Sequence, residues 1–194
     1  TGMDALTHAV EAYIGNSTTK ETREMAEEAV SLIYQHLKNA YEDGRNKEAR
    51  SGMLRAAYCA GVAFTKSYVG YIHAVAHSLG GQYGTPHGLA NAVILPIVLR
   101  MYGSACWKKL AQLARKAGVV EQGLSDEETA KCFIDWIQEM NDSMEIPRHF
   151  PQIRRKDIPV MARHADKEGN PLYPVPVLMN RKELERIYEE VKGR

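Results

Sequence analysis

Apolar residues recur along this chain at spacings of three and four, which is the period of an amphipathic helix. Leu6, Val10 and Tyr13 form one such stripe near the start, and comparable stripes continue through most of the chain. The pattern predicts helices over residues 4–13, 21–41, 47–67, 72–82, 89–102, 108–117 and 126–141, with short helices near 157–164 and 182–191. No segment alternates apolar and polar residues as a half-buried strand does. The expected fold class is therefore all-α, a multi-helix bundle.

Two segments carry more specific expectations. Residues 56–64 are apolar on every side of a helix, which predicts that the second half of the 47–67 helix is buried at the centre of the bundle. Pro96 falls inside the 89–102 helix and is expected to kink or interrupt it, because proline lacks the backbone N–H of the helical ladder.

Composition narrows the class of protein without identifying it. The chain has 194 residues, a length that predicts a single domain over residues 1–194. Its formal net charge of +1 argues against a nucleic-acid partner, which needs a basic excess. No apolar run is long enough for a transmembrane helix, so no membrane partner is expected. The three cysteines, Cys59, Cys106 and Cys132, are odd in number and widely spaced, which predicts free thiols and a cytoplasmic location.

The candidate chemistry lies in histidines at helical spacing. Asp4 and His8 are four residues apart, so on a helix they share one face. His73 and His77 repeat that spacing, and His87 follows a chain break ten residues later. A surface hydrogen bond would explain the first pair alone, and a buried histidine is often only a core residue. Three histidines within fifteen residues, among small apolar neighbours, favour a shared site instead.

These residue types also limit the metal and the reaction. One carboxylate oxygen with several imidazole nitrogens suits Zn²⁺ or Fe²⁺, whereas Mg²⁺ or Ca²⁺ prefers more oxygen ligands. The spacing of His73 and His77 is that of the zinc-peptidase motif H-E-x-x-H, but Ala74 stands where that motif has its general-base glutamate. A metallopeptidase is therefore not expected.

Three sequence blocks carry a resemblance to a known family. The blocks are GMDALTHAVEAY at 2–13, GYIHAVAHSLGG at 70–81 and PHGLANA at 86–92, and NPLYP at 170–174 follows. In this order they resemble the signatures of the iron-containing (group III) alcohol dehydrogenases, over nearly the whole chain. The resemblance implies the C-terminal helical domain of the dehydroquinate-synthase-like, iron alcohol dehydrogenase fold.

The same resemblance implies roles for individual residues. Asp4, His8, His73 and His87 would bind the metal, which is expected to be Fe²⁺, with Zn²⁺ as the alternative. His77 would not be a ligand; it would lie near the nicotinamide of NAD or NADP, where it would position the cofactor or relay the alcohol proton. Phe64 would line the pocket for a small-molecule alcohol or aldehyde.

One departure from the family concerns the cofactor. The family has an N-terminal α/β domain with glycine-rich turns for the dinucleotide, but Gly80, Gly81 and Gly84 lack the G-x-G-x-x-G spacing and follow no predicted strand. The chain is therefore expected to be a C-terminal fragment. In the intact enzyme it would serve hydride transfer between an alcohol, or the aldehyde or ketone, and NAD(P). The chain alone is expected to bind metal without turnover.

Other interpretations stay open at this point. A glycerol-dehydrogenase-like or dehydroquinate-synthase-like relative has a similar domain arrangement. A cofactor-independent metallohydrolase would need a general base, for which Glu11 is the only acidic candidate near the first ligand pair. A third possibility is a non-catalytic helical module whose histidines pack in the core. An exposed apolar face could also support a homo-oligomer.

Overall fold

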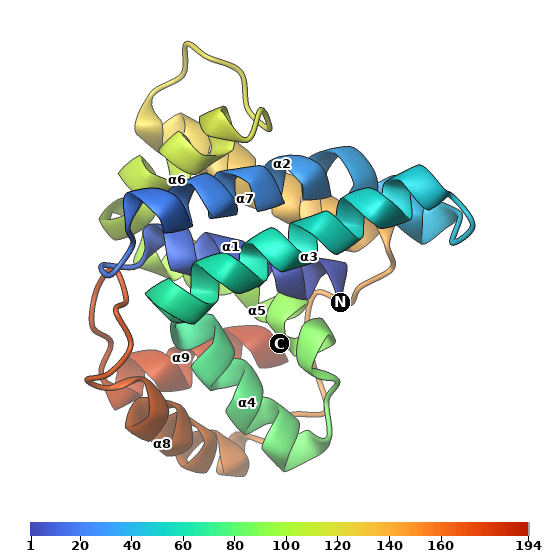
Figure 1. The fold of residues 1–194 in the computed structure, drawn as a ribbon. Coiled ribbons are helices and arrows are strands. Elements are labelled where there is room, and N and C mark those ends of the chain that lie inside the picture. The colour runs from blue at the N-terminus through green and yellow to red at the C-terminus, as the bar shows by residue number, and fades with distance from the viewer. Residues whose placement is uncertain (194) are drawn as a thin grey trace.

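The computed structural model describes residues 1–193 as a bundle of nine α-helices and one short 3₁₀ helix (Figure 1). The elements are α1 (Gly2–Ile14), α2 (Lys20–Glu42), α3 (Lys47–Ser67), α4 (Tyr71–Tyr83), α5 (His87–Tyr102), α6 (Ser104–Lys116), α7 (Asp126–Ser143), η1 (Arg155–Asp157), α8 (Ile158–Gly169) and α9 (Arg181–Lys192). These residues include no strand, so the all-α prediction is confirmed. The observed helices extend most of the predicted ones by a few residues at their ends.

The first helix is enclosed by its neighbours. It packs against α2, α3, α5 and α6, and all of its residues from Ala9 to Ile14 are buried. The α2–α3 hairpin covers it on the near side in Figure 1, while α4, α8 and α9 lie below the hairpin. The α4 helix packs on α5 and α8, which brings its first turn toward α1. Polar residues on such an enclosed helix are expected to have hydrogen-bond partners on the neighbouring helices.

The expectation of a central position for the second half of α3 is wrong. Ala56, Ala60 and Ala63 are fully buried, but Tyr58 is 69% exposed on the opposite side of the same helix. The helix lies on the surface, with its alanine side against α1 and α2. Small residues allow this close approach, and the outward apolar residues do not need an internal partner.

The helix that is buried on most sides is α5. Every residue from Ala90 to Pro96 is buried, and the helix continues through Pro96, so of the two predicted effects the interruption does not occur. Pro96 has no N–H to donate to the carbonyl of Ala92, four residues earlier. The side chain of Asn141 in α7 takes over that role, because its Nδ2 donates to the Ala92 oxygen at 2.7 Å. A partner from another helix thus allows α5 to continue.

This substitute hydrogen bond can be tested by a double-mutant cycle. Asn141→Leu should destabilise the metal-free chain by about 1–3 kcal/mol, because it leaves a buried carbonyl without a donor. In a Pro96→Ala background the same substitution should cost less, since the restored N–H at position 96 can pair with Ala92. Urea unfolding of the four proteins measures both costs. Equal costs in the two backgrounds would contradict the assignment.

Two further features bear on the sequence expectations. Among the described residues, no helix has both the length and the apolar character needed to cross a membrane. Cys59 and Cys106 are buried, Cys132 is exposed, and all three are free. The fold is therefore held by helix packing and not by cross-links among these cysteines.

Candidate metal centre

Four of the predicted site residues come together from three helices. Asp4 and His8 project from the first two turns of α1, His73 from the first turn of α4, and His87 is the first residue of α5. One potential ligand atom from each lies within 4.8 Å of the corresponding atoms of the other three. Asp4 and His87 are 83 positions apart, and the packing of α1 and α4 against α5 brings the four residues together.

The start of α5 approaches α1 closely because of a glycine. A Cβ on Gly88 would lie 3.4 Å from the Cβ of Asp4 and 3.3 Å from the backbone nitrogen of Thr1. With no side chain there, the Asp4 Oδ1 atom lies 3.4 Å from the Nε2 atom of His87. The Nε2 atom of His73 lies 3.9 Å from the same oxygen.

Asn91 is a site residue to which the sequence analysis gave no role. Its side chain is fully buried, and its Nδ2 lies 2.6 Å from Asp4 Oδ1, 3.2 Å from His73 Nε2 and 3.1 Å from His87 Nε2. Its Oδ1 has no hydrogen-bond partner among residues 1–193. The amide thus faces three of the four candidate ligand atoms, which all point toward one region. Its spacing of four from His87 was a signal that could have been used.

Burial favours the neutral form of two of the imidazoles, those of His8 and His87. Burial, reinforced by the neighbouring His73, lowers the pKa of His8 from 6.5 to about 4, although Asp4 and Glu11 oppose the shift. Burial also lowers the pKa of His87. Near neutral pH both rings therefore keep a free nitrogen lone pair, which is the form that binds a metal.

Phe64 contacts the group through His8. Its ring, on α3, is stacked on the His8 imidazole with a centroid separation of 4.2 Å and an interplanar angle of 18°. The opposite face of His8 is stacked on His73 at 4.5 Å. The rotation of the His8 ring is therefore restricted on both sides.

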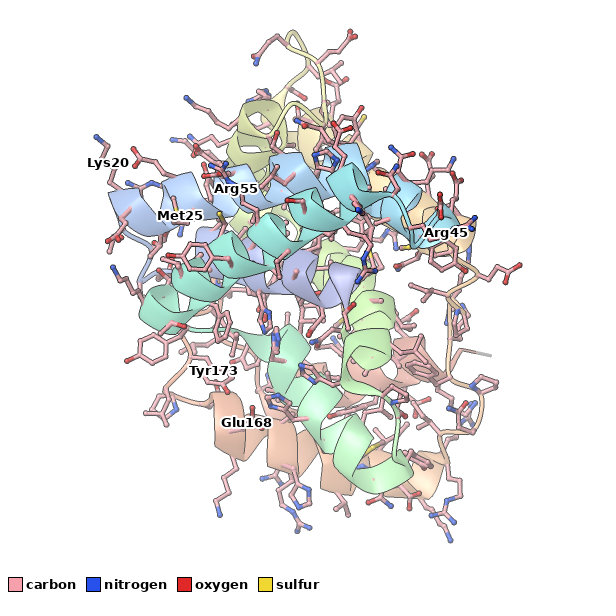
Figure 2. The ribbon with its side chains drawn as sticks, turned by 45° about the vertical axis from the view of Figure 1, so that its right-hand side comes forward. Lys20, Met25, Arg45, Arg55, Glu168 and Tyr173 are labelled. Atoms are coloured by element: carbon pink, nitrogen blue, oxygen red, sulfur yellow. The ribbon has the colours of Figure 1, made fainter. Side chains whose placement is uncertain are left out.

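His77 lies outside the four-residue group, one helical turn beyond His73. Its Nδ1 is 2.7 Å from Glu168 Oε1, and the Tyr173 hydroxyl donates to the same oxygen at 2.8 Å. Figure 2 labels Glu168 and Tyr173, which lie close together beside α4. The hydrogen bond to Glu168 raises the pKa of His77, and burial opposes the shift. Nothing in the sequence pointed to Glu168, because 91 positions separate it from His77.

Glu11, the candidate general base of a metallohydrolase, does not have the surroundings that this role requires. Its side chain is only 2% exposed, and its two oxygens bond the backbone N–H of Ile72 at 2.8 Å and His73 Nδ1 at 2.5 Å. A carboxylate engaged in this way does not face a water that could attack a substrate. The structure therefore does not favour the metallohydrolase that needed Glu11 as its general base.

The donor set defines the class of protein. One carboxylate oxygen and three imidazole nitrogens from three helices make a set suited to a divalent transition metal. The molecule is thus a helical domain with a candidate metal centre at the meeting point of α1, α4 and α5.

Comparisons with known proteins give the family. The model of the C-terminal part of the Fe-containing alcohol dehydrogenase family matches residues 1–191. The chain is 41% identical to 1,3-propanediol dehydrogenase of Citrobacter freundii over 98% of this chain and 49% of that protein. It is 35% identical to NAD-dependent methanol dehydrogenase of Bacillus methanolicus over 85% of this chain and 44% of that protein. The solved alcohol dehydrogenase of Oenococcus oeni superposes with a TM-score of 0.92 at 34% identity, over 98% of this chain and 50% of that one.

The chain belongs to the Fe-containing alcohol dehydrogenase family and corresponds to its C-terminal part. This confirms the predicted fold, which is the C-terminal helical domain of the iron-containing alcohol dehydrogenases. The chain spans about half the length of the relatives that it matches.

The electrostatics around His77 lead to a prediction for the metal-free chain. Glu168→Gln should lower the pKa of His77, because the hydrogen bond to the carboxylate is the largest cause of its elevation. A pH titration of the His77 imidazole by NMR measures the shift. Tyr173→Phe is the control, since it removes a donor to Glu168 but keeps the carboxylate, and it should leave the pKa of His77 raised. An unchanged pKa in Glu168→Gln would refute this account.

Proposed function

We propose that Asp4, His8, His73 and His87 together bind one divalent metal ion, Fe²⁺ in the first place and Zn²⁺ as the alternative. The observation that carries the proposal is the convergence of four ligand atoms within 4.8 Å. The chemistry of the donors supports it, because two of the imidazoles have lowered pKa values and the set combines nitrogen and oxygen ligands.

The proposed function of the intact enzyme is hydride transfer between a small alcohol, or its aldehyde or ketone, and NAD or NADP. A divalent ion in this group supplies a Lewis acid, which makes an alcohol hydroxyl more acidic and polarises a carbonyl in the reverse direction. The protein's own contribution is to hold the four ligands close together. Membership of the alcohol dehydrogenase family supports this assignment of the reaction.

His77 and Phe64 are proposed to act beside the metal ligands. His77 is half-exposed, stacked on the ring of His87 at 5.1 Å, and hydrogen-bonded to Glu168. This position suits a residue that orients the nicotinamide and moves the alcohol proton toward solvent. Phe64 covers one face of His8 and is proposed to form an apolar wall of the substrate pocket.

NAD(P) binding requires a type of structural element that these helices do not provide. A dinucleotide pyrophosphate is usually bound where a strand leads through a glycine-rich turn into a helix. Residues 1–193 contain no strand. We therefore assign NAD(P) binding to a separate α/β domain of the intact enzyme, and metal binding to this chain.

The metal site predicts a stoichiometry. The purified chain should bind one equivalent of Fe²⁺ or Zn²⁺ after anaerobic loading and desalting, as measured by elemental analysis. His73→Ala and Asp4→Ala should each abolish retention of the ion, because each removes one of the four proposed ligands and leaves only three. His164→Ala, which changes an exposed histidine on α8, is the control and should retain the ion. Full retention by His73→Ala would exclude the proposed ligand set.

A second prediction concerns activity. The metal-loaded chain of 194 residues should not reduce NAD⁺ or NADP⁺ with simple alcohols, because the described helices offer no strand-bound cradle for the pyrophosphate. Absorbance of the reduced nicotinamide measures this directly. A steady rate that disappears in His73→Ala would show that the helical domain suffices, and would overturn the assignment of cofactor binding to another domain.

A further inference from the structure

Glu11 is the charged side chain that lies deepest beside the candidate metal centre. It follows His8 on α1 by three residues, and its side chain is 2% exposed. Transferring a carboxylate into such an environment is costly unless its oxygens find hydrogen-bond donors. Both oxygens do: Oε1 accepts from the Ile72 N–H and Oε2 contacts His73 Nδ1. The two donors belong to the first turn of α4, so Glu11 joins α1 to the start of that helix.

The contact with His73 determines how this imidazole can be used. A neutral imidazole carries its proton on one nitrogen and a lone pair on the other. An ionised carboxylate only accepts hydrogen bonds, so the nitrogen facing Glu11 must be the protonated one. The lone pair then lies on Nε2, which is the nitrogen on the side of Asp4 and His87.

A glycine makes room for this carboxylate. Gly70 immediately precedes α4, and a Cβ at that position would lie 2.8 Å from Glu11 Oε1. Any side chain at position 70 would therefore displace the carboxylate. The backbone of Gly70 is extended, with φ of −139°, so the local conformation itself does not require glycine. The requirement is space for Glu11.

We propose that Glu11 is a positioning residue that holds His73 in the Nδ1–H form, and that Gly70 is needed because it admits the Glu11 carboxylate. The inference rests on the proposed metal site, to which it adds two residues that bind no metal themselves. Carboxylates that orient metal-binding histidines in this way commonly affect metal affinity 10- to 100-fold.

The amide of glutamine would reverse the arrangement. Glu11→Gln retains one acceptor oxygen and replaces the other by an NH₂ group, which can only donate. The Ile72 N–H can only donate, so it claims the remaining oxygen. The NH₂ group then faces His73 Nδ1, which can accept only when the ring proton moves to Nε2. In that form the nitrogen nearest Asp4 has no lone pair for a metal.

The experiment compares the variant with the native chain in two measurements. Competition between the protein and a chromophoric chelator for Zn²⁺ gives the affinity, and we expect Glu11→Gln to weaken it by about 10- to 100-fold. Long-range ¹H–¹⁵N spectra of the metal-free proteins give the tautomer of His73. We expect Nδ1–H in the native chain and Nε2–H in the variant.

Glu27→Gln is the matched control for the loss of one negative charge. Glu27 is a partly buried carboxylate on α2 that accepts a hydrogen bond from the Tyr13 hydroxyl at 3.0 Å, and it does not contact the candidate ligands. Its substitution should change neither the Zn²⁺ affinity nor the His73 tautomer. A loss of affinity in Glu27→Gln as large as that in Glu11→Gln would attribute the effect to net charge and overturn the inference.

Gly70→Ala provides a second variant that leaves Glu11 in place. The atom nearest to the new methyl group is a side-chain oxygen of Glu11 and not a backbone atom, so we expect the carboxylate to move while the fold persists. Zn²⁺ binding should weaken in the same direction as in Glu11→Gln. Gly81→Ala is its control, because that position on α4 is open and should tolerate the methyl group without loss. If Glu11→Gln fails to fold, Gly70→Ala decides the question.

The inference is overturned if the foldable variant keeps native Zn²⁺ affinity and the Nδ1–H form of His73. That outcome leaves the proposed function standing so long as His73→Ala still abolishes metal retention. Native retention by His73→Ala would instead remove the proposed function, and the inference with it. The two failures are therefore distinguishable.

Discussion

The contact between the buried face of α1 and the first turns of α4 and α5 is the constraint on which the rest of this structure depends. Asp4, His8 and Glu11 are on α1, and their partners are His73 and Asn91. Buried polar groups require hydrogen-bond partners, and Asp4 and Glu11 find theirs on α5 and α4, while the His8 ring stacks on His73. The position of α1 is thus set by polar contacts as well as by apolar packing.

This constraint explains why the surrounding helices are arranged as they are. The α2–α3 hairpin covers α1 with small residues, which allow close approach, while bulky residues such as Tyr58 point outward. The α5 helix, whose first residues bring His87 and Asn91 to the site, is buried from Ala90 to Pro96. It carries Pro96 within that buried path, and Asn141 supplies the hydrogen bond that the proline cannot make. Polar contacts between helices therefore stabilise the bundle at two places, at the candidate metal centre and beside Pro96.

The site divides into parts that differ in environment. His8 and His73 lie in the buried part, stacked between Phe64 and the rest of the group. His77 lies at the open side, where Glu168 contacts it and Tyr173 donates a hydrogen bond to Glu168. The pKa shifts of these two histidines have opposite directions and different causes: burial lowers the pKa of His8, whereas the hydrogen bond to Glu168 raises that of His77. The two environments suit the proposed roles, a neutral metal ligand for His8 and a proton-moving group for His77.

The sequence by itself determined the helices, the candidate ligands and the family, because helical periodicity and short motifs are local properties of the chain. It also brought Asp4 together with His8 on one helix face. It misjudged the surroundings of α3 and the continuity of α5, because burial and a hydrogen bond from Asn141 depend on neighbours that no local pattern specifies. The partners of His73 and His77 were likewise decided only by tertiary structure. Glu11 is 62 positions from His73, and Glu168 is 91 positions from His77, so only the packed bundle could show that each carboxylate meets an imidazole.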